Sequence, residues 1–180
     1  MTGRLFAVVG PSGVGKDTLL AGAVARDPSL HWARRVITRP ESAGGEPFLG
    51  VDQAVFQSFK RAGHFALCWD AHGLSYGIPH AEVLPLQAGR TVMFNGSRAE
   101  LPAAQHVFPD LQVIRITAPS RVLAERLAAR GRESLEEIET RLRRASYEVP
   151  PGLPVIDVVN DSAPEVGISR LLAALGQAAP

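Results

Sequence analysis

The chain has 180 residues, of which 46% are hydrophobic and 21% charged, and its formal net charge is +1. This composition is ordinary for one globular domain, and the near-neutral charge excludes a general electrostatic attraction to nucleic acid or to a membrane surface. Cys68 is the sole cysteine, so no intrachain disulfide can form, and we expect a reducing, cytoplasmic compartment.

The first elements in chain order are a strand, a glycine-rich turn and a helix. An apolar run at about 4–9 predicts a buried strand, and apolar residues at helical spacing predict a helix at about 16–26. Because Met1 to Arg4 leads directly into that strand and no apolar run is long enough to span a bilayer, we expect neither a signal peptide nor a membrane segment.

A phosphate-binding loop is predicted between this strand and this helix. Glycines let the backbone turn its N–H groups toward an anion, and the helix N-terminus adds partial positive charge. The chain has two lysines against 17 arginines, and one of the two, Lys16, stands where it can reach the β- and γ-phosphates of ATP. The nucleotide-binding residues expected here are Gly10, Pro11, Ser12, Gly13, Val14, Gly15, Lys16, Asp17 and Thr18. The alternative is a glycine-rich turn that binds no ligand.

Asp17 departs from the usual pattern of such a loop. A Ser or Thr, whose hydroxyl binds Mg²⁺, normally follows the lysine. The Asp17 carboxylate either holds Mg²⁺, directly or through water, or only favours the helix N-terminus by its charge.

The region 33–89 interrupts the regular alternation of strands and helices and is the candidate for an inserted substrate-binding subdomain. The elements predicted in it are strands at 33–38 and 64–69, a loop at 40–50, a helix between Asp52 and Gly63 with Val55, Phe56 and Phe59 on its apolar face, a turn at 70–77 and a short helix at 79–87.

The remainder of the chain alternates regularly. Strands are predicted at 91–95, 111–117 and 155–159, with helices that begin near Ser97, Ser120, Ser134 and Ser162, the third of them with Ile138 and Leu142 facing inward. This alternation predicts an α/β fold in which helices cover both faces of a parallel sheet. We expect one domain over 1–180, with its core at about 1–32 and 90–180.

Arginines stand at two places that suit phosphate binding. Arg39 follows a predicted strand and precedes a proline, so it can clamp a sugar phosphate; the alternative is a surface ion pair with Glu41 or Glu46. Arg126 and Arg130 are four residues apart and share one face of a helix, which is either functional or simply solvated.

Polar side chains also gather where a buried strand ends. Asn95, Ser97 and Arg98 lie at the edge where parallel sheets bind ligands, and they hold ribose hydroxyls or a phosphate unless they are only a helix cap and a surface arginine. Tyr76 either hydrogen-bonds a substrate phosphate or packs as an amphipathic core residue. The five histidines show no metal-ligand spacing, and we expect no zinc site.

From about Arg4 to Leu175 the chain resembles the guanylate kinases, within the nucleoside monophosphate kinase group of P-loop NTPases. The matching segments are Thr38-Arg39 with Gly44-Gly45-Glu46, Gly63-His64-Phe65 with Ser75-Tyr76-Gly77, the arginines Arg126, Arg130 and Arg141, and Val158 to Asp161. The resemblance implies a lid at about 126–145 that brings Arg126, Arg130 and Arg141 to the phosphates as catalytic cations beside Lys16. It also implies that Asn160 borders the adenine.

Several positions depart from the guanylate kinase pattern. Leu67 replaces the glutamate that reads guanine, Ile78 replaces a hydroxyl residue, and Ser42 replaces a second phosphate-binding arginine. A guanine pocket without its carboxylate leaves the N–H groups of the base unpaired, which costs orders of magnitude in discrimination. The resemblance therefore disfavours GMP as the substrate.

A narrower resemblance, to the ribose 1,5-bisphosphate phosphokinases of phosphonate metabolism, fits these departures. It rests on the segments 10–17, 36–40, 44–46, 72–73, 76–79 and 95–98. It implies ATP- and Mg²⁺-dependent phosphorylation of a small sugar phosphate, ribose 1,5-bisphosphate, to 5-phospho-α-D-ribose 1-diphosphate, with no nucleic acid or membrane partner. The alternatives are a nucleoside monophosphate kinase with altered base choice and a non-catalytic guanylate-kinase-like interaction module. The sequence leaves open a monomer or a homodimer.

Overall fold

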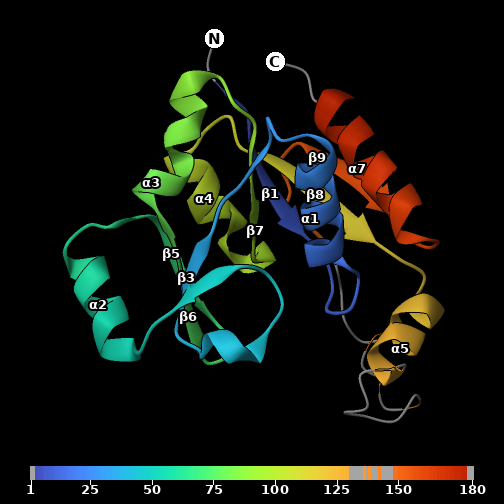
Figure 1. Ribbon diagram of the computed structural model, residues 1–180, viewed down its shortest axis with the longest axis horizontal. Coiled ribbons are helices and arrows are strands. Elements are labelled where there is room, and N and C mark those ends of the chain that lie inside the picture. Colours follow the sequence, from blue (N-terminus) through green and yellow to red (C-terminus); the bar gives the residue numbers. More distant parts are fainter. Residues whose placement is uncertain (1–2, 130–135, 137, 139–141, 143–147, 178–180) are drawn as a thin grey trace.

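A computed structural model describes residues 3–129, 136, 138, 142 and 148–177 of the chain. Its larger sheet has five strands in the order β2-β7-β1-β8-β9, and every neighbouring pair is parallel (Figure 1). The strands are β1 (Leu5–Val9), β2 (His31–Trp32), β7 (Val92–Asn95), β8 (Gln112–Thr117) and β9 (Val155–Val159). The predicted parallel sheet is confirmed.

Strand β1 lies at the centre of this sheet and is buried on both faces. Phe6 and Val8 pack into one hydrophobic cluster, whereas Leu5, Ala7 and Val9 pack into another on the opposite face. A strand covered on both sides needs apolar residues at every position, which explains the uninterrupted apolar run in the sequence.

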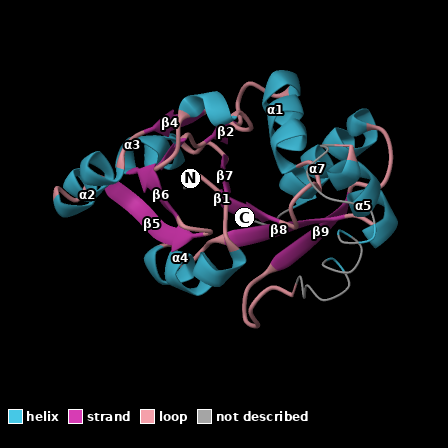
Figure 2. Cartoon of the chain, turned by 90° about the horizontal axis from the view of Figure 1, so that it is seen from below, coloured by secondary structure: helices cyan, strands magenta, loops and turns pink. Residues whose placement is uncertain are grey.

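Helices cover both faces of the five-stranded sheet, as predicted. The helices α1 (Lys16–Arg26), α5 (Ser120–Ala128) and α7 (Pro164–Gln177) pack on the side of Phe6, and α4 (Leu101–Val107) packs on the side of Leu5 (Figure 2). Ile138 and Leu142 are buried in the same cluster as Phe6, which confirms the prediction that they face inward. None of the helices in the described ranges is long and apolar enough to cross a bilayer.

A second sheet occupies the region 33–89 and lies beside the first (Figure 1). Its four strands run in the order β4-β3-β6-β5, with β3 and β4 parallel and the other pairs antiparallel. They are β3 (Arg35–Ile37), β4 (Phe48–Gly50), β5 (Phe65–Ala71) and β6 (Leu74–Pro79), accompanied by α2 (Gln53–Arg61) and α3 (His80–Val83). Short 3-10 helices follow β3, α3 and β7 at Glu41–Ala43, Leu84–Ala88 and Arg98–Glu100.

Three predictions for this region are wrong in detail. The strand predicted at 33–38 is reduced to Arg35–Ile37, because the chain leaves the first sheet after His31–Trp32, a short strand that was not predicted, and enters the second at Arg35. The predicted loop at 40–50 contains β4, and the predicted turn at 70–77 ends at Gly73, where β6 begins one residue later. All three errors concern strands of three to six residues, whose formation depends on pairing in the sheet more than on their own composition.

Helix α2 begins as predicted but buries less of its apolar face. The Asp52 carboxylate accepts a hydrogen bond from the backbone N–H of Val55 at 2.8 Å, which is the expected N-cap. Phe56 is buried and stacks on Phe65 with ring centroids 4.8 Å apart, whereas Val55 is 38% exposed. Phe56 is therefore the main anchor of α2.

Candidate active site

The predicted loop and the polar residues after β7 lie together at the carboxyl edge of the five-stranded sheet. In the strand register, Val8 of β1 pairs with Asn95 of β7 on one side and with Ile114 of β8 on the other. Strand β1 ends at Val9 and β7 ends at Asn95, and the edge at which they end is where ligands bind in open parallel sheets. The topology thus brings the segment 10–17 next to Asn95.

The backbone of the loop passes too close to its neighbours for most side chains. At Gly15 the backbone is left-handed, with φ 93°, and an added Cβ would lie 2.8 Å from Nδ2 of Asn160. At Gly10 an added Cβ would lie 2.4 Å from the carbonyl oxygen of Ile116. The glycines are required by this close approach as well as by the room that a phosphate needs.

Two residues from the C-terminal half of the chain hold the loop in place. Asn160, which directly follows β9, donates from Nδ2 to the carbonyl oxygen of Val14 at 2.8 Å. Arg126 of α5 donates from Nη1 to the carbonyl oxygen of Asn160 at 3.0 Å and to that of Val14 at 3.3 Å. Both predicted site residues therefore contact the loop, whereas the other two predicted lid arginines, Arg130 and Arg141, lie outside the described residues.

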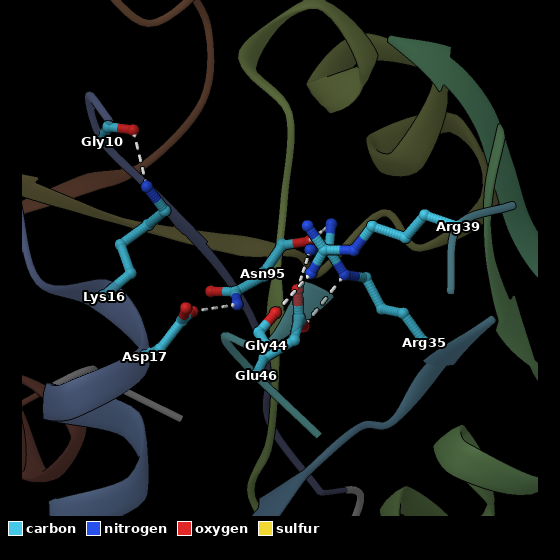
Figure 3. Close-up of polar contacts among 8 residues, drawn as sticks. All are labelled: Gly10, Lys16, Asp17, Arg35, Arg39, Gly44, Glu46 and Asn95. Atoms are coloured by element: carbon cyan, nitrogen blue, oxygen red, sulfur yellow. Dashed lines mark hydrogen bonds and ion pairs between the residues drawn. The ribbon is translucent and has the colours of Figure 1, made fainter. Parts of the chain in front are cut away.

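Lys16 is the first residue of α1, and its side chain reaches back across the loop. Its ammonium group donates to the carbonyl oxygen of Gly10 at 2.8 Å and to that of Pro11 at 3.3 Å (Figure 3). The positive charge thus lies over the same turn whose amides lead into the helix N-terminus. A mobile cation beside a helix N-terminus is an arrangement suited to the phosphates of a nucleotide.

Asp17 and Asn95 form a hydrogen-bonded pair beside the loop. Nδ2 of Asn95 donates to Oδ1 of Asp17 at 2.8 Å (Figure 3). Because an ionised carboxylate only accepts, this bond fixes which way the Asn95 amide points. Asn95 is 3% exposed, and its Oδ1 atom accepts no hydrogen bond from any described residue. An acceptor buried in this way needs a donor, such as a hydroxyl group or a water molecule.

Arg39 extends toward this pair from the second sheet (Figure 3). It donates from Nη2 to the carbonyl oxygen of Gly44 at 2.9 Å, and its guanidinium lies 4.4 Å from the ring centroid of Phe48. Among the described residues it forms no ion pair, so the alternative of pairing with Glu41 or Glu46 is wrong.

Glu46 instead pairs with Arg35, a residue that the sequence did not single out. The guanidinium of Arg35 meets both oxygens of the Glu46 carboxylate, and the side chains are 12% and 4% exposed. A charged residue next to Val36 and Ile37 in a short strand is the one sequence signal that could have indicated a buried ion pair.

Of the remaining predicted substrate residues, Tyr76 lies in β6 of the second sheet, whereas Ser97 and Arg98 follow β7 of the first. The ring of Tyr76 stacks on that of Trp69 at 5.6 Å and is packed against the apolar cluster of Leu5, which favours the core interpretation. Ser97 lines an apolar pocket between β5, β7 and α4, and its side chain makes no capping hydrogen bond to the following 3-10 helix, which begins at Arg98. Within the described ranges, no group of three or more His, Cys, Asp or Glu side chains is arranged to hold a metal ion.

The fold of the chain is similar to that of two solved kinases at low sequence identity. Guanylate kinase from Anaplasma phagocytophilum aligns with a TM-score of 0.68 and 18% identity, covering 97% of this chain and 85% of that one. A gluconokinase from Sinorhizobium meliloti aligns with a TM-score of 0.54 and 15% identity, covering 98% and 93%. At these identities the likeness concerns the fold alone, and it confirms the predicted guanylate-kinase-like P-loop architecture.

Curated relatives are much more similar in sequence, although no profile of a known protein family matches the chain. Ribose 1,5-bisphosphate phosphokinase PhnN of Ruegeria sp. is 52% identical over 161 residues, which cover 89% of this chain and 84% of that protein. The enzyme of the same name from Agrobacterium fabrum is 44% identical over 178 residues, with 97% of both covered. The bifunctional ribose 1,5-bisphosphokinase-thymidine phosphorylase of Cupriavidus necator is 47% identical over 175 residues, but the chain spans only 29% of its length.

Proposed function

The chain belongs to the ribose 1,5-bisphosphate phosphokinase family, and we propose that it transfers the γ-phosphoryl group of ATP to ribose 1,5-bisphosphate. The products are 5-phospho-α-D-ribose 1-diphosphate and ADP. The observation that carries this proposal is the 44% identity to the Agrobacterium fabrum enzyme over 97% of both chains. The geometry of the loop and of the second sheet supports it.

We propose that the loop at 10–18 binds ATP. Asn160 and Arg126 hold its backbone through the carbonyl oxygen of Val14, and the ammonium group of Lys16 lies over it. On ATP binding, Lys16 exchanges the carbonyls of Gly10 and Pro11 for phosphate oxygens, which are stronger acceptors because they are charged. Arg126, Arg130 and Arg141 are proposed to add positive charge at the transferring group, as in the family resemblance.

The sugar phosphate is proposed to bind between the loop and the second sheet. Arg39 is the cation that the second sheet directs toward Asp17, and it forms no ion pair among the described residues. Asn95 Oδ1 can accept from a ribose hydroxyl but not from a phosphate oxygen, because both are acceptors. Tyr76, Ser97 and Arg98 are proposed to border this region.

The side chains beside the loop also fit a magnesium ion, which the resemblance implies. Asp17 binds Asn95 through Oδ1, which leaves Oδ2 as a hard oxygen ligand, and Asn95 Oδ1 is a buried acceptor suited to a water molecule on the ion. Mg²⁺ is usually held by one or two carboxylates together with waters and substrate phosphates. When bound, it would neutralise charge on the phosphates during transfer.

The transfer itself requires no general base. The attacking atom is an oxygen of the 1-phosphate, which is already an anion; it forms the new bond to the γ-phosphorus while the bond to the β-phosphate oxygen of ADP breaks. Catalysis then consists of holding the two phosphates in line and neutralising their charge. Lys16, Arg39 and the loop amides are the groups of this chain that are proposed to do so.

The test is to incubate the purified protein with ATP, Mg²⁺ and either ribose 1,5-bisphosphate or one of a panel of nucleoside monophosphates, and to identify the products by phosphorus NMR. When ribose 1,5-bisphosphate is the substrate, we expect 5-phospho-α-D-ribose 1-diphosphate and ADP to form in equal amounts. Turnover of GMP or another nucleotide, with none of ribose 1,5-bisphosphate, would reject the proposed substrate.

A further inference from the structure

A buried ion pair links the second sheet to the residues beside the phosphate loop. Glu46 is 6% exposed and is the one charged residue among those that are buried in the described ranges. Both of its carboxylate oxygens are bound by Arg35, which lies at the start of β3. Burying two charges costs desolvation free energy, which is recovered only if the geometry of the pair is good and additional hydrogen bonds are formed.

The additional hydrogen bond runs to the first sheet. Nη1 of Arg35 donates to the carbonyl oxygen of Asn95, the last residue of β7, at 3.0 Å. The guanidinium also lies 4.8 Å from the ring centroid of Tyr76 and 5.8 Å from that of Trp69. Each of the three guanidinium nitrogens therefore has an acceptor within the protein, so Arg35 is held in place and is not the group that binds substrate phosphate.

Asn95 continues the connection to the phosphate loop. Its backbone oxygen is bound by Arg35 and its side chain by Asp17, the residue after Lys16 (Figure 3). A polar chain thus runs without interruption from Glu46 through Arg35 and Asn95 to Asp17.

A second route joins the same two places. Gly45, next to Glu46 in sequence, lies between the proposed substrate cation and the loop: a Cβ on Gly45 would be 3.5 Å from Nη2 of Arg39 and 3.5 Å from Oδ2 of Asp17. The carboxylate of Glu46 therefore anchors the segment that separates Arg39 from Asp17.

We infer that Glu46 and Arg35 are positioning residues, which set Asp17 and the segment 44–46 relative to Arg39 and so align the donor and acceptor phosphates. This inference rests on the proposed function for its catalytic consequence. Phosphoryl transfer needs the two phosphates in line, and a displacement of about 1 Å costs on the order of 100-fold in rate.

Glu46→Gln tests the inference, with Glu82→Gln as the matched control. Glu82 also joins the two parts of the fold, through Nε2 of His31 at 2.8 Å and the backbone N–H of Arg34 at 2.9 Å, and neither hydrogen bond involves Asp17 or Asn95. We expect Glu46→Gln to lower kcat about 100-fold and Glu82→Gln to leave it unchanged. Because Glu46→Gln leaves Arg35 buried without its counter-ion and can unfold the protein, the double variant Arg35→Met with Glu46→Leu carries the same test without a buried charge.

A second measurement, of the coupling between Glu46 and Asp17 in nucleotide binding, distinguishes a positioning role from a purely structural one. A fluorescent ADP analogue is titrated with and without Mg²⁺, and the Mg²⁺-dependent gain in affinity is compared among Asp17→Asn, Glu46→Gln and the variant carrying both. We expect each single variant to lose most of the gain and the combined variant to lose no more than Asp17→Asn alone. If the losses of affinity gain caused by Asp17→Asn and Glu46→Gln multiply in the combined variant, the two residues act independently and the inference is overturned. A wild-type kcat in the double variant Arg35→Met with Glu46→Leu would also overturn it. If the wild-type protein does not phosphorylate ribose 1,5-bisphosphate, the proposed function fails, and the titration still decides the coupling.

Discussion

Lys16 combines a local structural role with the charge that the proposed transfer needs. Its ammonium group bridges two carbonyls within its own loop, so its removal costs little folding free energy. We expect Lys16→Ala to lower kcat about 100- to 1,000-fold, because a cation directed at the transferring phosphates is lost. The control is Lys60→Ala, which removes the only other lysine from an exposed position on α2. Steady-state kinetics and thermal unfolding of both variants decide the matter; equal activities would show that Lys16 is not part of the machinery.

Substitutions at two glycines with nearly equal φ angles can distinguish the effect of backbone strain from an effect on function. Gly15 has φ 93° and Gly152 has φ 91°, but an added Cβ meets Asn160 at Gly15 and nothing within 4 Å at Gly152. Each Gly→Ala variant should lose about 1–2 kcal/mol of folding free energy, because a left-handed conformation disfavours a side chain.

Only Gly15→Ala should also weaken nucleotide binding, because its methyl group displaces the side chain that holds the carbonyl of Val14. Urea unfolding and titration with a fluorescent ADP analogue measure the two effects. Loss of binding in Gly152→Ala as well would mean that strain alone, rather than the contact with Asn160, accounts for the effect.

At the scale of elements, the sequence predicted a helix or strand correctly where a single local property, such as continuous apolarity or a capping residue, determines it. Strand β1 is apolar throughout because it is covered on both faces, and α2 begins where Asp52 can cap it. Strands β3, β4 and β6 were misjudged because their existence depends on partners elsewhere in the second sheet. The hydrogen bonds of a short strand are supplied by its neighbours, and its own residues carry a weak preference.

The pairing of β8 with β9 includes an ion pair that depends on pH. Arg115 donates to both oxygens of Asp157, at 2.6 Å from Nε and 2.8 Å from Nη2, and these hydrogen bonds hold the pKa of Asp157 below its ordinary value of 3.8. Since the pKa is lowered on folding, the stabilisation is present above pH 3.8 and is lost as the pH falls below it.

Asp157→Asn should therefore cost less than about 1 kcal/mol at pH 7, because both side chains are partly exposed and the pair is screened by solvent. Urea denaturation of the wild type and the variant at several pH values tests this. We expect the difference in unfolding free energy to shrink below pH 3.8. A difference that stays constant into strong acid would show that the charge of Asp157 is not its source.

At the scale of the whole molecule, the candidate site lies where the two sheets meet, and buried residues of β5 and β6 share the hydrophobic cluster of Leu5. Phe56 is 2% exposed and anchors α2 on Phe65, but it belongs to neither of the two hydrophobic clusters that flank β1. Phe56→Ala should cost about 3–5 kcal/mol of packing within the second sheet.

We expect this variant to raise the KM for the sugar phosphate while the affinity for an ADP analogue stays within about twofold of the wild type. Hydrogen exchange would locate the loosened amides in α2 and β5. An equal loss of both affinities would show that the two sheets form one cooperative unit.

Some parts of the candidate site could be predicted from the sequence and others could not. The loop at 10–18 was predictable because a short contiguous motif specifies it, and Asn95 and Arg39 were predictable from their places at strand ends. The pairing of Glu46 with Arg35 was not, because it depends on the path of the segment 38–46 between β3 and β4, which no local pattern encodes.

One further consequence concerns folding during translation. The carbonyl of Val14 is held by Asn160, a residue 146 positions later in the chain. The loop leaves the ribosome before β9 does, and it acquires this support only after β9 has emerged. A nascent chain therefore carries the proposed nucleotide-binding loop long before that loop has its support, and a product truncated ahead of Asn160 should bind ATP poorly.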